Sequence, residues 1–269
     1  MSNPKGTALI TGASSGIGAI YADRLARRGH DLILAARDEA RLNAIAERLR
    51  AEAGVSVEVI SADVTNRADL RVLEQRLRDD AAIQLLINNA GAALLSPFAA
   101  ADPDDLDKLI QLNVTAVTRL ANAAAAGFSV RGAGAIVNIG SVVGLAPEFG
   151  NTVYGATKAF VLYLSQSLAH ELAGAGVRVQ AVLPGATRTE IWERSGRGIE
   201  NVPAEILMDA DELVDAALAG FDAGELVTLP SLPDAEDWRA FEAARLALQP
   251  NLSKRHPAAR YGVKLVEPA

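Results

Sequence analysis

A tyrosine and a lysine stand four residues apart in the segment YGATK, as Tyr154 and Lys158. On a helix this spacing places both side chains on one face, one turn apart. A phenol normally titrates near ~10, which is too high for easy proton exchange at neutral pH. An ammonium ~6 Å away, at an effective dielectric of ~20, contributes roughly 2.8 kcal/mol, or about two pKa units. The pair can therefore exchange protons, although a tyrosine packed beside a solvated lysine is the commoner reason for this spacing.

Ser141 adds a second polar group to this pair. It ends the apolar run GAIVNIGS, which is typical of a buried strand. In folds with parallel strands, ligands collect at the carboxyl ends of the strands. The sequence therefore predicts a site at a sheet edge, where the Ser141 hydroxyl holds a substrate oxygen.

The segment TGASSGIG, at residues 11–18, has the composition of a phosphate-binding turn. Gly12, Gly16 and Gly18 stand where a strand turns into a helix, approaches a ligand and packs against that helix. Amides at the start of the helix would then receive a pyrophosphate. The same glycines also suit a purely structural turn, and the shorter string GASSG matches a hydrolase nucleophile elbow with Ser14 as the attacking residue.

Arg37 ends the next apolar run, DLILAAR, and is predicted to reach the same sheet edge. A guanidinium there can pair with the 2′-phosphate of NADP, whereas a carboxylate would bind the free 2′-hydroxyl of NAD. Arg37 therefore favours NADP(H), and NAD(H) stays possible because Asp38 follows. The alternative is a solvated arginine at the start of a helix.

Seven short apolar runs, which alternate with amphipathic stretches, position these residues. Uniformly apolar strands separated by helices are typical of a parallel sheet covered on both faces. The sequence thus predicts an α/β fold with a doubly wound, Rossmann-type parallel sheet of seven strands. In the first helix, Ile17, Ile20, Tyr21 and Leu25 should face the sheet, and Gly29 should end the helix. The predicted strands are TALITG, DLILAAR, SVEVISAD, LLINNAG, GAIVNIGS, RVQAVLPG and ELVTLPS.

Composition limits the classes of function. Half of the 269 residues are hydrophobic, which supports a large core, and the formal charge of −7 argues against a broad basic surface for nucleic acid or anionic lipid. The chain has no cysteine, so thiolate catalysis and cysteine-bound metals are excluded, and no metal site is expected. No apolar run reaches the ~18 residues of a membrane span, and the amino terminus lacks a signal segment. We expect a cytoplasmic protein without nucleic-acid or membrane partners.

The chain is predicted to form one domain over residues 1–269, with two irregular parts. Residues 186–208 follow a strand but are interrupted by glycine, charge and proline, which indicates an inserted substrate loop. Residues 232–269 are expected to be a tail with one short helix.

Seven motifs follow one another along the predicted elements: TGASSGIG at 11–18, DV at 63–64, NNAG at 88–91, Asn113, Ser141, YGATK at 154–158 and PGATRT at 184–189. In their order and on these elements, they resemble those of the short-chain dehydrogenase/reductase family in its compact single-domain form, over about residues 6–190. The resemblance implies hydride transfer with NADP(H) that reduces a ketone or aldehyde, or oxidises the matching secondary alcohol. It also implies a homodimer or homotetramer.

The resemblance assigns four catalytic residues. Tyr154 would be the general acid, Lys158 would lower its pKa and hold the nicotinamide ribose, and Ser141 would orient the substrate carbonyl. Asn113 would hold a water that links Lys158 to solvent. Asn113 and Asn89 can also be structural anchors between elements. The implied cofactor-binding residues are Gly12, Ser14, Ser15, Gly16, Ile17, Gly18, Arg37, Asp63, Val64, Asn89, Ala90, Gly91, Tyr154, Lys158, Pro184, Gly185, Thr187 and Thr189.

Two segments are expected to line the substrate pocket, residues 145–151 and 186–208. Ile191, Trp192 and Met208 in the second segment favour an apolar small-molecule substrate. The alternative is that these side chains pack a lid.

Two other functions are compatible with parts of the sequence. A serine hydrolase would need a histidine for Ser14, and the chain offers only His30, His170 and His256, each of which is expected at the surface. A non-catalytic NADP(H)-binding regulator would keep the cofactor residues without turnover. We expect an enzyme, because no catalytic position departs from the family's pattern.

Overall fold

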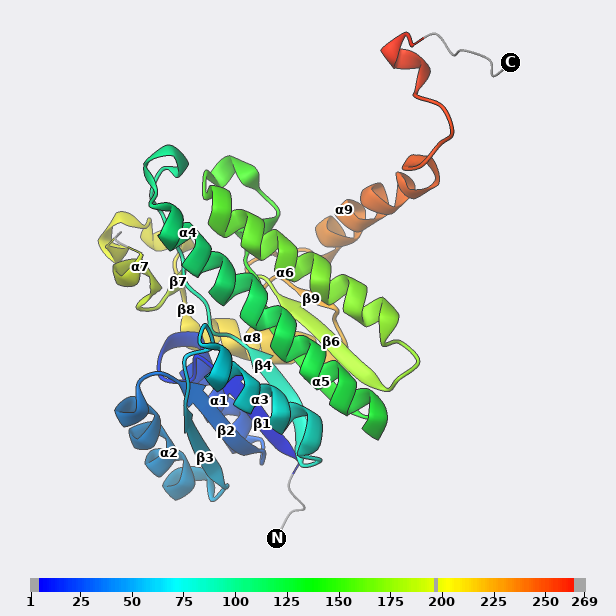
Figure 1. Ribbon diagram of the computed structural model, residues 1–269. Coiled ribbons are helices and arrows are strands. Elements are labelled where there is room, and N and C mark those ends of the chain that lie inside the picture. Colours follow the sequence, from blue (N-terminus) through cyan, green and yellow to red (C-terminus); the bar gives the residue numbers. More distant parts are fainter. Residues whose placement is uncertain (1–4, 196–197, 264–269) are drawn as a thin grey trace. The chain divides into compact units, whose positions relative to one another are not determined.

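The computed structural model describes residues 5–195 and 198–263 (Figure 1), and its main sheet contains the seven predicted strands. All of them run parallel, in the order β3-β2-β1-β4-β5-β6-β9. The predicted fold class is therefore confirmed. The strands are β1 (Thr7–Thr11), β2 (Asp31–Ala36), β3 (Val57–Ser61), β4 (Ile83–Asn88), β5 (Gly134–Ile139), β6 (Val177–Val182) and β9 (Val227–Thr228).

The strand order reverses between β1 and β4. After β1 the chain adds β2 and β3 on one side, and then places β4 on the other side of β1. In a doubly wound sheet, the carboxyl ends of the strands at such a switch point are where ligands bind. The glycine turn follows β1 and NNAG spans the end of β4, so the topology brings these two motifs to the switch point.

Strand residues alternate between two hydrophobic cores, one on each face of the sheet. Along β1, Ala8 and Ile10 belong to one core and Leu9 to the other. This alternation follows from the pleat of a strand, and burial on both faces explains why the runs are uniformly apolar. The first core includes residues of α1 (Gly16–Arg27), α2 (Glu39–Ala53) and α8 (Ala210–Ala223), and the second includes residues of α3 (Arg67–Asp79) and α5 (Val117–Arg131).

The first helix has the predicted inward face. Tyr21 and Leu25 of α1 are buried in the first core, and Ile17 and Ile20 pack against it. The helix ends at Arg27, and Gly29 follows with a φ of 86°. This left-handed conformation favours glycine, so the predicted stop signal is confirmed.

A π-helical segment interrupts the long helix after β4. Between α4 (Pro103–Ile110) and α5, residues Gln111–Ala116 form π-helical turns. Such turns are rare and occur frequently at functional sites. Asn113 lies in this segment, which the apolar pattern of the sequence did not predict.

The segment between β6 and α8 has more regular structure than predicted. A second, two-stranded parallel sheet pairs β7 (Thr187–Arg188) with β8 (Met208–Asp209), and α7 (Ile191–Arg194) follows β7. Residues 196–197 of the predicted substrate loop lie outside the described residues. The Trp192 indole donates to the Thr187 carbonyl at 2.8 Å, and Met208 packs against the first core. These contacts support the packing interpretation for both side chains.

The chain divides into two compact units, one that ends at Pro230 and one that begins at Ser231. The first unit contains every strand of both sheets. The second contains α9 (Ala235–Ala247), where Trp238 and Phe241 stack with ring centroids 5.3 Å apart. The predicted tail, residues 232–269, lies within this second unit, and the single domain over residues 1–269 stays a prediction. Among the described helices, none is both long enough and apolar enough to cross a membrane.

Candidate active site

The turn after β1 leaves no room for a side chain at Gly12 or Gly18. A Cβ on Gly12 would lie 2.8 Å from the Asn89 side-chain nitrogen, and one on Gly18 would lie 2.3 Å from the Gly12 carbonyl oxygen. Ser15 occupies the N-cap position of α1, but its side chain makes no capping hydrogen bond. The first N–H groups of a helix have no partner within the helix. The turn thus combines close backbone approach with amide donors, as a pyrophosphate would require.

Asn89 holds this turn in place. Its Nδ2 donates to the carbonyl of Thr11 at 2.9 Å and to that of Gly12 at 3.2 Å. In return, Thr11 Oγ1 accepts from the backbone nitrogens of Asn89 and Ala90, each at 3.1 Å. The Asn89 side chain is therefore a structural anchor between β1 and β4, as the alternative interpretation had it.

Arg37 and Asp63 follow β2 and β3, and they interact electrostatically. Partial burial raises the pKa of Asp63. Hydrogen bonds from Thr65 and the charge of Arg37 lower this pKa by more, so that the net pKa lies below its usual range. The Thr65 amide and hydroxyl donate to Asp63 Oδ1 at 2.9 and 2.7 Å. Arg37 itself is exposed. The two residues predicted to bind the adenosine part of a cofactor thus lie together.

Four further predicted cofactor residues fall into two groups. Ile17 packs against the first core and Val64 is buried in the second, so that their side chains serve packing. The PGATRT segment joins the other parts of the site: the Pro184 carbonyl accepts from the Ser141 hydroxyl at 3.2 Å. The methyl group of Thr189 lies 3.2 Å from the position of a Cβ on Gly16.

Ser141 and Tyr154 meet between the end of β5 and the start of α6 (Thr152–Glu171). The Ser141 hydroxyl donates to Pro184 and accepts from the Val143 amide at 3.3 Å. Burial raises the pKa of Tyr154 to about 12, and a hydrogen bond with the Ser141 side chain opposes this rise. The structure therefore brings together the hydroxyl and the phenol that the sequence placed in one site.

Lys158 is buried, with 7% of its surface exposed. Its Nζ donates to the Ile139 carbonyl at 2.9 Å and lies 5.7 Å from the centroid of the Tyr154 ring. This distance is measured to the centre of the ring, whereas the separation of about 6 Å expected from the sequence refers to the phenol and stays a prediction. Burial lowers the pKa of Lys158 to about 8. The sequence predicts that this ammonium lowers the Tyr154 pKa. In the structure the Tyr154 pKa is raised instead, because burial of the phenol has the largest effect on it.

Asn113 reaches the loop after β4 from the π-helical segment. Its Oδ1 accepts from the Ala92 amide at 3.0 Å, and its Nδ2 donates to the Ala92 carbonyl at 2.9 Å and to Thr157 Oγ1 at 3.1 Å. A Cβ on Gly91 would lie 3.3 Å from Asn113 Oδ1 and 3.6 Å from Lys158 Nζ. Both polar groups therefore face Gly91, and the Asn113 side chain acts as an anchor.

Two side chains that link parts of the candidate site went unnoticed in the sequence. One is Thr157, whose hydroxyl contacts Asn113. The other is Glu190, which pairs with Arg41 of α2 at 2.9 Å and also with Arg194. Arg41 and Glu190 are 149 positions apart, and no local spacing could have paired them.

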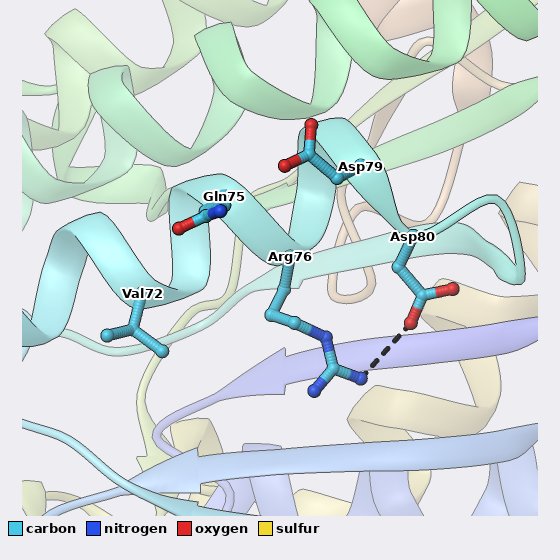
Figure 2. A pocket seen from close by; sticks show the side chains of 5 residues that line it. All are labelled: Val72, Gln75, Arg76, Asp79 and Asp80. Atoms are coloured by element: carbon cyan, nitrogen blue, oxygen red, sulfur yellow. Dashed lines mark hydrogen bonds and ion pairs between the residues drawn. The ribbon is translucent and has the colours of Figure 1, made fainter.

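A hollow on the surface of α3 carries none of the predicted site residues. Figure 2 shows its lining, in which Arg76 extends to Asp80 with a separation of 3.1 Å. The residues there are a solvated helix face with an internal ion pair, so we do not count it as a candidate site. The lining consists of Val72, Gln75, Arg76, Asp79 and Asp80.

The hydrolase interpretation of Ser14 is not favoured. His30 Nδ1 lies 3.2 Å from the carbonyl of Gly6, just before β1, whereas Ser14 follows the end of that strand. A strand of this length spans roughly 17 Å. His170 lies in the last turn of α6, at the opposite end of that helix from Tyr154. Neither histidine is placed to activate Ser14.

Comparison with known proteins gives one consistent family. Residues 6–199 match the family model described as short chain dehydrogenase. A short-chain dehydrogenase from Sphingobium yanoikuyae, solved in complex with NADPH, is 58% identical, with 95% of this chain and 99% of that chain covered and a TM-score of 0.93. The bulky-bulky ketone specific alcohol dehydrogenase from Comamonas testosteroni is 52% identical, with 96% and 99% covered and a TM-score of 0.89. The NADP-dependent 3-hydroxy acid dehydrogenase of Salmonella typhi is 37% identical over 220 residues, which cover 77% of this chain and 86% of that protein.

Proposed function

The chain belongs to the short-chain dehydrogenase/reductase family and is an enzyme of that family, and we propose that it reduces bulky ketones with NADP(H) or oxidises the matching secondary alcohols. The observation that carries the proposal is the proximity of a hydroxyl, a phenol and an ammonium at one end of the sheet. Ser141 is hydrogen-bonded to Tyr154, and Lys158 Nζ lies 5.7 Å from the Tyr154 ring. Such a group can hold a carbonyl oxygen and transfer a proton to it.

The residues present fit an NADP cofactor. Gly12 and Gly18 let the backbone approach a pyrophosphate, and the uncapped start of α1 offers amide donors. The exposed Arg37 guanidinium suits a 2′-phosphate. The Sphingobium neighbour was solved with NADPH, which supports the same assignment. When bound, this cofactor supplies or accepts the hydride at the substrate carbon.

The side chains of the site divide the proton chemistry among them. Ser141 orients the carbonyl oxygen, and Tyr154 gives its phenolic proton to that oxygen as the carbon–oxygen double bond becomes single. A pKa near 12 keeps Tyr154 protonated at neutral pH, as a proton donor requires. Lys158, with a pKa of about 8, is mostly charged at pH 7 and stabilises the phenolate that remains. In the oxidative direction the phenolate takes the alcohol proton.

The two segments predicted to line the substrate pocket expose large apolar side chains. Phe149 is 62% exposed, and Ile206 is 59% exposed. Exposed apolar side chains favour an apolar ligand. The Comamonas neighbour is described as specific for bulky-bulky ketones. We therefore infer that the substrates of this protein are ketones with two large apolar substituents. A cytoplasmic location stays a prediction.

Replacement of Tyr154 tests the mechanism. The Tyr154→Phe variant should lose ketone reduction by about 10²- to 10⁴-fold, because it lacks the proton donor, and it should still bind NADPH in a fluorescence titration. Tyr163→Phe is the matched control, since Tyr163 lies on the same helix with 73% of its surface exposed, and it should retain activity. Full activity in Tyr154→Phe would refute the assignment, and a wild-type protein that binds NADPH without turnover would be a regulator.

A panel of ketones tests the substrate class. Acetone, an aryl methyl ketone and a ketone with two large substituents would be compared with NADPH and NADH, by the absorbance of the reduced nicotinamide. We expect the highest kcat/KM for the ketone with two large substituents. A preference for acetone would contradict the bulky-ketone proposal while leaving the reductase assignment intact.

A further inference from the structure

Thr157 forms two hydrogen bonds at the centre of the site. Its hydroxyl donates to the Tyr154 carbonyl at 2.7 Å and accepts from Asn113 Nδ2 at 3.1 Å. The side chain is buried, with 3% of the residue exposed. It therefore connects the π-helical segment, which carries Asn113, with the first turns of α6, which carry Tyr154 and Lys158.

We propose that Thr157 is a positioning residue, whose hydroxyl fixes the Tyr154 turn of α6 against Asn113. This inference rests on the proposed reductase function. Thr157 touches neither substrate nor cofactor in the mechanism above. It acts through the backbone carbonyl of Tyr154 and the side chain of Asn113.

The direction of the hydrogen bonds shows why a hydroxyl is required. A carbonyl can only accept, and the Asn113 Nδ2 group can only donate. Thr157 must therefore give its single proton to the Tyr154 carbonyl and accept the second proton of the Asn113 amide. Serine preserves this arrangement. Valine has the same shape without the hydroxyl, and it would leave a buried N–H of Asn113 without its acceptor.

Asn113, which Thr157 links to the Tyr154 turn of α6, lies near Gly91, as Lys158 does. Asn113 is fixed on its other side by two hydrogen bonds to Ala92. The neighbouring Gly91 lies close to both Asn113 Oδ1 and Lys158 Nζ. A shift of the α6 turn relative to Asn113 would therefore move the phenol and the ammonium relative to the cofactor-binding backbone. Misplacement by about 1 Å can cost on the order of 10²-fold in rate.

Ser165 provides a matched control on the same helix. Its hydroxyl donates to the Val161 carbonyl at 2.7 Å and accepts from Asn138 Nδ2 at 2.9 Å. Ser165 is fully buried. The pattern of one carbonyl acceptor and one asparagine donor is the same as at Thr157, but none of the Ser165 partners belongs to the site. A purely structural role would make the two hydroxyls equivalent.

The kinetic experiment compares Thr157→Val, Thr157→Ser and Ser165→Ala in the full-length protein. We expect Thr157→Val to lose about tenfold to a hundredfold in kcat for ketone reduction, with the KM for ketone and the Kd for NADPH changed by less than about twofold. Thr157→Ser should restore kcat to within about threefold, and Ser165→Ala should keep it. An unchanged kcat in Thr157→Val, or an equal loss in Ser165→Ala, would overturn the proposal.

A second experiment is independent of turnover. Urea unfolding of Thr157→Val, Asn113→Ala and the double variant forms a double-mutant cycle. We expect non-additive losses, because both single changes break the same hydrogen bond. If the losses in the free energy of unfolding are additive, the proposed coupling of Thr157 and Asn113 is overturned. A wild-type protein that reduces no ketone would refute the proposed function, and the cycle would still decide whether Thr157 and Asn113 are coupled.

Discussion

At the scale of the residue, burial controls the acid–base behaviour of the Tyr154 and Lys158 pair. Burial raises the pKa of the phenol to about 12 and lowers that of the ammonium to about 8. Both shifts favour the neutral form, as the loss of hydration dictates. At pH 7 the site nevertheless contains a protonated phenol beside a largely charged lysine, which is the pairing that carbonyl reduction requires.

The lowered pKa of Lys158 predicts a pH dependence of stability. Between pH 8 and 10 the unfolded chain keeps the lysine proton that the folded protein has lost, so the free energy of unfolding rises with pH. Relative to Lys158→Met, the wild-type protein should gain about 2–3 kcal/mol between pH 7 and 10. Urea unfolding at several pH values, without added cofactor, measures this difference. It is read below pH 10, because the raised pKa of Tyr154 acts in the opposite direction above that value.

Parallel curves for the wild-type protein and Lys158→Met would contradict this expectation. They would show that the ammonium stays hydrated in the folded protein.

Arg37 is expected to set the cofactor preference. In Arg37→Asp, the ratio of kcat/KM for NADPH over NADH should fall by about tenfold to a hundredfold, because hydrogen bonds to charged groups contribute ~1.5–3 kcal/mol. Steady-state kinetics with both cofactors measure the ratio. Arg71→Asp makes the same change of charge at an exposed position of α3 and should leave the ratio unchanged. An unchanged ratio in Arg37→Asp would remove Arg37 from the 2′-phosphate site.

At the scale of the element, the local sequence predicted the turns and ends that glycines make, but it did not predict the π-helical segment. The glycines after β1 and the Gly29 stop of α1 follow from backbone sterics, which the sequence displays directly. Asn113, in the π-helical segment, forms hydrogen bonds with Ala92 and Thr157, which come from other parts of the chain. Helical periodicity alone cannot report these contacts.

The segment after β6 gives a prediction about cofactor binding. Glu190 joins this segment to α2 through Arg41, and the methyl group of the adjacent Thr189 lies 3.2 Å from where a Cβ on Gly16 would stand. Glu190→Gln should raise the KM for NADPH by about two- to fivefold, since an exposed ion pair contributes up to ~1 kcal/mol. The effect should fade at high salt.

Asp209→Asn is the control for Glu190→Gln. It breaks the equally exposed pair of Arg188 and Asp209, 2.7 Å apart, which stays within the small sheet. This control should not change the KM. A lower KM in Glu190→Gln would mean that Glu190 competes with the cofactor for Arg41.

At the scale of the whole molecule, the division at Pro230 predicts that the first unit folds alone. Within the described residues, it contains all the strands and both cores. The second unit is short, and no residue of α9 is buried. A chain truncated after Pro230 should therefore unfold cooperatively in urea. Loss of cooperative unfolding would show that the tail is part of a single domain over residues 1–269. Assembly into dimers or tetramers stays a prediction.

The sequence by itself determined the fold class and the family, and it predicted the residues of the site. These depend on apolar periodicity, on glycines that sterics require, and on motifs that keep their order along the chain. Only the tertiary structure decided which partners those residues have. It assigned the Asn89 amide to the glycine turn, tied Thr157 to Asn113, paired Glu190 with Arg41 and raised the Tyr154 pKa. The physical reason is that hydrogen bonds and desolvation depend on groups far apart in the chain, whose contacts no local spacing encodes.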